Sequence, residues 1–117
     1  MAIGIPGIDE GIFNDLMDGD EDLYASVLGS YIDQTPSVLS KLATVSKETL
    51  ADFAVTVHGL KGACANICAE KARQMAYSLE LKAKAGDFTG VQAENGLFLK
   101  YVEDLLPELK DWYGKHK

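Results

Sequence analysis

Apolar residues recur every three or four positions along most of the chain, and no segment alternates apolar and polar residues over the length of a strand. This spacing places apolar side chains on one face of an α-helix, whereas a half-buried strand needs a period of two. The clearest stripe consists of Leu50, Phe53, Val57, Leu60, Cys64 and Ile67. The chain is therefore predicted to be all-α.

The same pattern predicts five helices, at about residues 9–17, 20–43, 46–67, 72–83 and 88–112. Asp9 and Asp20 are candidate N-caps, because a carboxylate there can accept the unpaired amide protons of the first turn. Pro36 is expected to kink or break the second helix, and Pro107 to bend or shorten the last. Four long amphipathic helices with short loops predict an antiparallel up-down four-helix bundle, with the short N-terminal helix capping one end.

Length and composition fit one globular domain over residues 1–117, with its bundle core at about 20–112. The net charge of −7 argues against nucleic acid as a partner, because such a surface repels phosphate. No apolar run approaches the roughly 20 residues that span a bilayer, and the N-terminus lacks the pattern of a secretory signal. We therefore expect a cytoplasmic protein without membrane contact, with residues 1–8 as an irregular arm and 115–117 as a solubilising tail.

One of the two histidines lies in the sequence HGLKG of residues 58–62. At about 100° per residue, His58 lies roughly 130° from the centre of the apolar stripe, so its side chain is expected to be exposed. Lys61 at i+3 and Gly62 at i+4 lie beside it on a helix. Glycine costs about 1 kcal/mol relative to alanine inside a helix, so two of them in one turn require a reason. A nucleophilic nitrogen, a neighbouring ammonium and open space together suit the acceptance of a phosphoryl group.

Other interpretations of these residues stay open. An exposed histidine beside a lysine is common on protein surfaces, and Gly59 and Gly62 could mark a helix break instead. The sequence GLKG also fits the GxxG loop of KH domains, which an all-helical acidic chain disfavours. We find no functional reason for Gly59.

The sequence HGLKG at 58–62, followed by ANI at 65–67, resembles the histidine-containing phosphotransfer (HPt) domain. The pairs Leu79-Glu80 and Gly86-Asp87 match two further features of that family, and the similarity covers roughly residues 20–112. The family fold is a four-helix bundle, which the helix pattern predicts independently. Cys68 departs from the family pattern, which usually has glycine there. Either the helix geometry differs at this point, or the turn tolerates cysteine without a positive φ.

The resemblance implies that His58 is phosphorylated and exchanges the phosphoryl group with receiver-domain aspartates of a two-component phosphorelay. Lys61 would offset the charge of the phosphate, and Gly62 would leave room for it and for the docking receiver. Gln34 would hydrogen-bond the imidazole and fix its tautomer, as a glutamine does in some family members. Lys84 stands where some members have a basic residue that helps to hold the phosphate, although a solvated lysine is the alternative.

The docking surface would lie on the His58 face, around Ala54, Ala65 and Lys84. The partners implied are response-regulator receiver domains, a hybrid sensor histidine kinase, or both, and the chain itself is expected to be a monomer. The sequence has neither a nucleotide-binding glycine loop nor a carboxylate cluster placed for Mg²⁺. We therefore expect a phosphocarrier without kinase activity or a cofactor of its own, to which the receiver brings Mg²⁺.

Two other functions stay open. The bundle could dock a receiver or another protein without phosphotransfer, although the presence of both His58 and Lys61 argues against this. Cys64 and Cys68, one helical turn apart, could form a redox or metal site with the histidine. However, Cys64 falls on the core stripe and His58 on the opposite side, so one ion could not reach both. Buried, inert thiols are the expected outcome.

Overall fold

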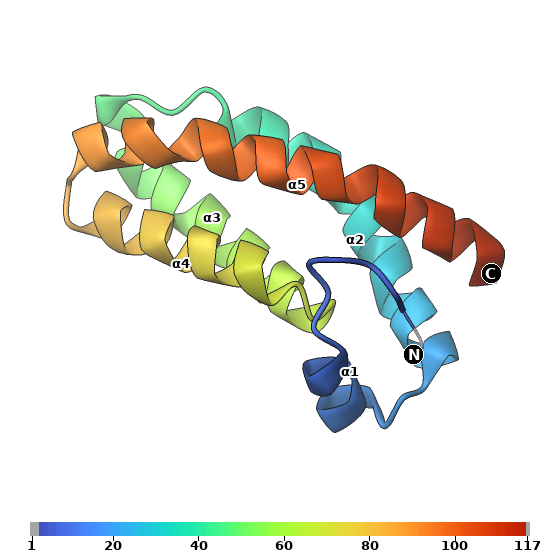
Figure 1. Ribbon diagram of the computed structural model, residues 1–117. Helices are drawn as coiled ribbons and strands as arrows, with labels where there is room; N and C mark the ends of the chain where they lie inside the picture. Colours follow the sequence, from blue (N-terminus) through green and yellow to red (C-terminus); the bar gives the residue numbers. More distant parts are fainter. Residues whose placement is uncertain (1–2, 117) are drawn as a thin grey trace.

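The computed structural model describes residues 3–116, and in this range the protein is helical and has no strand (Figure 1). The helices are α1 (Glu10–Met17), α2 (Glu21–Leu42), α3 (Leu50–Asn66), α4 (Glu70–Lys84) and α5 (Phe88–His116), with a short 3₁₀ turn, η1 (Lys47–Thr49), before α3. None of the helices in this part of the chain is long and apolar enough to cross a membrane. The all-α prediction and the five expected helices are confirmed.

Two helix starts follow from local side-chain chemistry. The carboxylate of Asp9 accepts a hydrogen bond from the amide of Ile12 at 3.0 Å, which begins α1. The carboxylate of Asp20 accepts from the amides of Asp22 and Leu23 at 3.0 and 3.1 Å, which begins α2. Each bond satisfies an amide that has no partner inside its own helix. Both predicted N-caps are confirmed.

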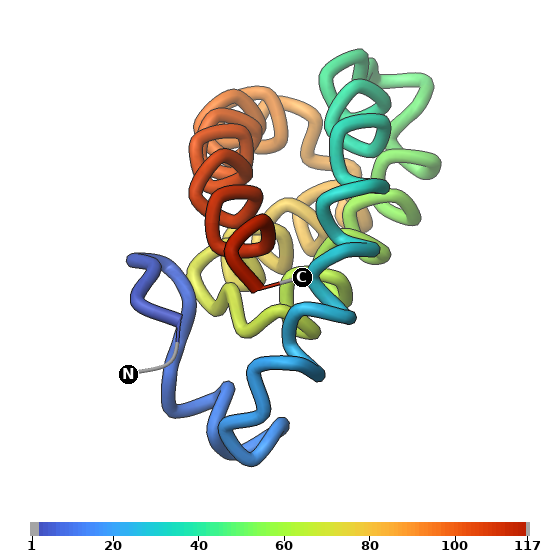
Figure 2. Tube along the Cα trace, turned by 90° about the vertical axis from the view of Figure 1, so that its right-hand side faces the viewer, coloured from blue at the N-terminus to red at the C-terminus, as the bar shows by residue number. Residues whose placement is uncertain are grey.

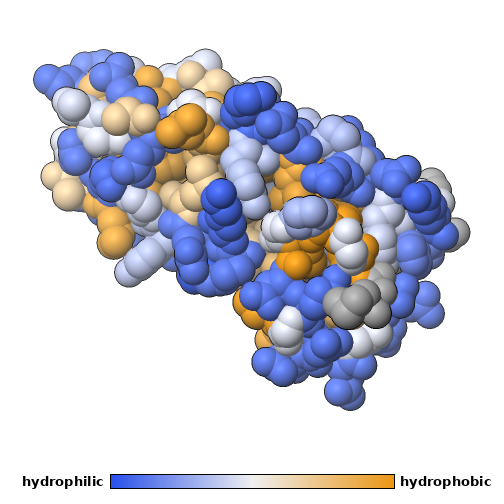
Figure 3. All heavy atoms as spheres, in the orientation of Figure 1, coloured by the Kyte–Doolittle hydropathy of each residue, from blue (hydrophilic) through white to orange (hydrophobic). Residues whose placement is uncertain are grey.

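The four long helices pack together (Figures 1 and 2), and their buried apolar side chains belong to one core. Helix α3 packs against α2 and α4, and α5 packs against the same two helices. The predicted stripe of α3 lies inside, with Leu50, Phe53, Val57, Leu60, Cys64 and Ile67 all buried. The face in Figure 3 is mostly hydrophilic, and apolar side chains show where α4 meets α5 and beside the N-terminal segment.

Neither proline ends its helix, so the expected break at Pro36 and the expected shortening at Pro107 do not occur. Helix α2 continues through Pro36 to Leu42, and α5 continues through Pro107 to His116. Both prolines lie on the exposed face of their helices, where water can bond the carbonyl that loses its helical donor. The predicted tail at 115–117 is helical as far as His116, and residue 117 lies outside the described residues.

The N-terminal segment is irregular, as predicted, but it is part of the core. Ile3, Ile5 and Ile8 are 6%, 8% and 6% exposed, and the amide of Asp9 donates to the carbonyl of Cys68 at 2.8 Å. The core therefore extends beyond the expected range of 20–112, because three isoleucines without helical spacing cover one end of it. Residues 1–2 of the expected arm lie outside the described residues.

Helix α3 ends in a Schellman turn built on a cysteine. Cys68 has φ 63°, its amide donates to the carbonyl of Ala65, and the amide of Ala69 donates to the carbonyl of Cys64. This left-handed conformation costs a non-glycine residue roughly 1–2 kcal/mol. The possibility that the turn would avoid a positive φ is therefore wrong: cysteine adopts the conformation that glycine adopts more easily.

Candidate functional site

His58 lies near the middle of α3 on the side away from the core, and its side chain is 62% exposed. The neighbouring stripe residues Val57 and Leu60 are 0% and 3% exposed, so the backbone that carries the histidine is anchored in the core. This exposure is the one predicted from the helical period. The imidazole is thus held by a packed helix and open to a partner.

The imidazole is bonded to a buried carboxylate on the neighbouring helix. Nδ1 of His58 lies 2.7 Å from Oε2 of Glu80, and the Glu80 side chain is only 2% exposed. The packing of α3 against α4 brings these two residues together across 22 positions of sequence. Since an ionised carboxylate can only accept, Nδ1 is the nitrogen that carries the proton in this pair.

Two lysines complete the cluster around Glu80. Nζ of Lys61 lies 2.7 Å from Oε1, and Nζ of Lys84 lies 2.8 Å from Oε2. Burial alone would raise the pKa of Glu80, but the hydrogen bonds from Lys61, Lys84 and His58 outweigh it and lower that pKa to about 2. The carboxylate is therefore ionised at neutral pH, and its negative charge holds three donors in place.

The other ring nitrogen faces open space. Among residues 3–116, no hydrogen bond or ion pair involves Nε2 of His58. A side chain at Gly62, one turn farther along α3, would meet no atom within 4 Å. A hollow of about 240 Å³ also adjoins the ring and is lined by Ala54, Val55, His58, Glu80 and Lys84. Space for a group the size of a phosphoryl is therefore available beside the imidazole, whose Nε2 has no partner among residues 3–116.

Most of the residues singled out in the sequence meet at this site, and one does not. Lys61, Lys84 and Ala54 lie around His58 and Glu80, and the side chain of Ala65 is half-buried on the same helix. Gln34 is exposed on α2, and within the described residues no hydrogen bond joins it to the imidazole. The bond expected from Gln34 is made by Glu80 instead.

Sequence reasoning missed the role of Glu80, although two signals pointed to it. The residue belongs to the Leu79-Glu80 pair that matches the HPt family, and it directly follows a core position of α4. A carboxylate beside the buried Ala76, Leu79 and Ala83 requires cationic or hydrogen-bonding partners, because an unpaired buried charge is costly. The lysine and histidine of α3 supply them.

The two cysteines are buried and unpaired, as predicted. Cys64 is 0% exposed, burial raises the pKa of its thiol to about 11, and its Sγ lies 3.5 Å from the hydroxyl of Tyr31. A thiol with that pKa is a poor nucleophile at neutral pH. Across residues 3–116, no three His, Cys, Asp or Glu side chains are grouped so that they could hold a metal ion.

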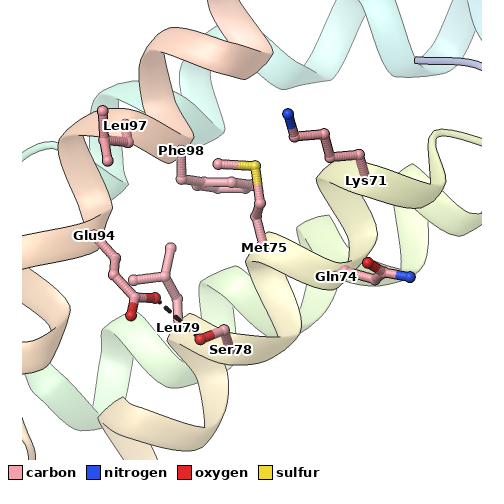
Figure 4. A pocket seen from close by; sticks show the side chains of 8 residues that line it. All are labelled: Lys71, Gln74, Met75, Ser78, Leu79, Glu94, Leu97 and Phe98. Carbon is pink, nitrogen blue, oxygen red and sulfur yellow. Dashed lines mark hydrogen bonds between the residues drawn. The ribbon is translucent and has the colours of Figure 1, made fainter.

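A second hollow, of about 390 Å³, lies between α4 and α5 (Figure 4). Its lining includes the apolar Met75 and Phe98, and Ser78 donates a hydrogen bond to Glu94 at 3.0 Å. It is lined by none of the predicted site residues, namely Gln34, Ala54, His58, Lys61, Gly62, Ala65 and Lys84. The candidate site is therefore the cluster of His58, Glu80, Lys61 and Lys84.

Comparison with known proteins gives no match to a family model, to a curated protein or to a solved structure.

Proposed function

We propose that the protein is a histidine phosphotransfer domain that accepts a phosphoryl group on His58 and donates it again. One observation carries the proposal: an exposed imidazole whose Nδ1 is bonded to the buried Glu80 while Nε2 faces open space. This arrangement fixes the ring orientation and leaves the basic nitrogen outward, as a nucleophile requires. In this proposal the helices form an antiparallel up-down four-helix bundle with α1 at one end, the fold of the HPt family.

The donor would be an aspartyl phosphate of a receiver domain. The lone pair of Nε2 attacks phosphorus, and an N–P bond forms while the O–P bond to the aspartate breaks. The aspartate leaves as a carboxylate and keeps the bonding electron pair. Nδ1 keeps its proton, so the carboxylate of Glu80 balances the positive charge of the phosphorylated ring. Reverse transfer follows the same path.

The two lysines would offset the charge of the phosphate, because both ammonium groups lie beside the imidazole on the shared carboxylate. Lys84 is 61% exposed and can extend toward the incoming group, whereas Lys61 is 22% exposed and more firmly held. Phosphoryl transfer depends mainly on positioning and charge compensation, which a site without a nucleotide loop can supply. Mg²⁺ would come with the receiver.

The surface around His58 suits a protein partner. Val55 lies one turn before the histidine and is 75% exposed, and the hollow beside the ring is walled on one side by Ala54 and Val55. An exposed aliphatic group next to a polar reaction centre is typical of a docking patch. A receiver domain, free or as part of a hybrid kinase, is the partner that this chemistry requires.

The test is transfer from phosphorylated receiver domains of the source organism, each incubated with the purified protein. We expect label on the protein that is labile in acid and stable in base, as a phosphohistidine is. His58→Gln should abolish it, and His116→Gln should not, because His116 has both ring nitrogens engaged. Absence of label with every receiver, or equal labelling of the His58 variant, would contradict the proposal. Binding without transfer would favour a docking module instead.

A further inference from the structure

Tyr77 lies one turn before Glu80 on α4, and its ring faces Lys61. Nζ of Lys61 is 5.0 Å from the centroid of the Tyr77 ring, within the range of a cation–π interaction. The same ammonium lies 2.7 Å from Oε1 of Glu80. The lysine is therefore held between a carboxylate and an aromatic face.

This contact restricts the geometry of the whole cluster. Lys61 occupies Oε1 of Glu80, which leaves Oε2 for Nδ1 of His58 and for Lys84. If Lys61 were free to swing away, the carboxylate could rotate and the imidazole would lose its fixed orientation. The Lys61 side chain is only 22% exposed, and the Tyr77 ring, with its centroid 5.0 Å from Nζ, lies on one side of the ammonium. A less hydrated ammonium beside the imidazole interacts more strongly with a developing negative charge.

We infer that Tyr77 is a positioning residue for phosphoryl transfer, which acts on His58 through Lys61 and Glu80. This inference rests on the proposed function. Tyr77 itself touches neither the imidazole nor the reacting atoms; it fixes the ammonium that orients their carboxylate.

The experiment uses phosphoramidate, a small donor that needs no docking surface. Nε2 of His58 forms a bond to phosphorus while the P–N bond breaks and ammonia leaves, so the rate reports the site alone. Tyr77→Leu keeps an apolar side chain but removes the aromatic face, and we expect phosphorylation to be slower by about two- to fivefold. Tyr77→Phe keeps the face and should react as the wild type does. Each rate is corrected for labelling of a His58→Gln protein.

A double-mutant cycle separates positioning from a general effect on structure. In a Lys61→Ala background the aromatic face has nothing to hold, so Tyr77→Leu should cause no further loss. The protons on Cε of Lys61 should also be shifted upfield by the ring in the wild type and in Tyr77→Phe, and not in Tyr77→Leu.

The outcomes distinguish the two proposals. If the wild-type protein takes no phosphoryl group on His58 from phosphoramidate or from receivers, the proposed function fails and the positioning role fails with it. If the wild type is phosphorylated and Tyr77→Leu reacts as fast as it does, only the positioning role is overturned. The same holds if Tyr77→Leu slows the reaction equally in the wild-type and Lys61→Ala backgrounds.

Discussion

The two histidines of the protein are both hydrogen-bonded to glutamate, yet they have opposite surroundings. His58 has one ring nitrogen on Glu80 and the other facing open space. His116 has Nδ1 on the carbonyl of Trp112 at 2.8 Å and Nε2 on the carboxylate of Glu21 at 3.0 Å. Its ring is also stacked on Trp112, with centroids 3.8 Å apart. A glutamate partner alone therefore does not distinguish the two histidines, because only His58 has a ring nitrogen without a partner among residues 3–116.

The partners differ in kind as well. Glu80 is 2% exposed and receives three donors, whereas Glu21 is 40% exposed and pairs across the solvent-accessible ends of α2 and α5. A buried carboxylate with cationic partners fixes geometry strongly, because any rotation leaves a charge unpaired. An exposed pair of this kind contributes little to stability and joins two helix ends. His58 therefore has one ring nitrogen without a partner among residues 3–116, whereas both ring nitrogens of His116 are bonded.

Filling the open side of His58 should have the largest effect. Gly62→Gln places a side chain one turn from the imidazole, where no protein atom lies within 4 Å. We expect transfer from a receiver to fall by about a hundredfold, because a displaced phosphoryl group misses the in-line geometry. Stability should rise by about 0.5–1 kcal/mol, since glycine is a poor helix former. Transfer rates and urea denaturation check the two effects.

Gly59→Gln is the matched control for this prediction. Gly59 lies in the same helix, a side chain there also meets no atom within 4 Å, and the helix should gain similar stability. Because position 59 is adjacent to His58 rather than one turn away, it does not lie directly beside the ring. Equal loss of transfer in both variants would show that bulk anywhere on this face blocks the partner, and Gly62 would lose its special role.

Removing the hydrogen bond between His58 and Glu80 should have the second-largest effect on transfer. Glu80→Gln keeps the shape but loses the charge that orients the ring and holds Lys61 and Lys84. Hydrogen bonds to charged groups contribute about 1.5–3 kcal/mol, so we expect phosphorylation of His58 to slow by roughly ten- to a hundredfold. Glu21→Gln, which removes the matching partner of His116, should leave the rate unchanged. Similar rates for Glu80→Gln and the wild type would mean that the ring needs no orientation.

The parts of this site that could be predicted from the sequence are those within one helix. Lys61 and Gly62 follow His58 at i+3 and i+4, so the helical period alone places them beside it. Glu80 and Tyr77 come from α4, and their approach depends on the register between two packed helices, which periodicity does not specify. Gln34 was assigned from family resemblance, and its exposed place on α2 offers the imidazole no hydrogen bond.

The fold was predictable for the same reason, because each helix carries its own apolar stripe. The N-terminal segment escaped prediction, since Ile3, Ile5 and Ile8 have neither a helical nor a strand period and are buried only by tertiary packing. The helices continue through Pro36 and Pro107 because the free-energy cost of a proline depends on whether water can bond the carbonyl that loses its helical donor. Cys68 likewise adopts φ 63° because the Schellman turn and the bond from Asp9 define the backbone there.

Acid should remove the contribution of Glu80 to stability. Its pKa is about 2 in the folded protein against an ordinary value of 4.5, so its stabilising effect is complete above pH 4.5 and is lost as the pH falls toward 2. The effect is at most about 3 kcal/mol, from 1.36 kcal/mol per pKa unit. We expect the difference in unfolding free energy between wild type and Glu80→Gln to shrink over this range. Urea denaturation at several pH values measures it.

Glu70 provides an internal reference for that measurement. Its bidentate bond with Arg73 also lowers its pKa to about 2, so it titrates over the same range in both proteins and cancels in the difference. If the difference in unfolding free energy between the wild type and Glu80→Gln stays constant from pH 5 to 2, Glu80 is not held ionised by its three donors.

The smallest effect is expected at the second histidine. His116→Gln removes the contact with Glu21 and the stacking on Trp112, both at a partly exposed site, so we expect a loss of only about 0.5–1 kcal/mol in unfolding free energy. Trp112 is the single tryptophan of the chain, so its fluorescence reports the loss of the stacked ring directly, while circular dichroism follows unfolding. His58→Gln should leave that fluorescence unchanged. If His116→Gln changed the phosphorylation rate, His116 would affect the reaction at His58, and the prediction that only His58 takes part in it would be contradicted.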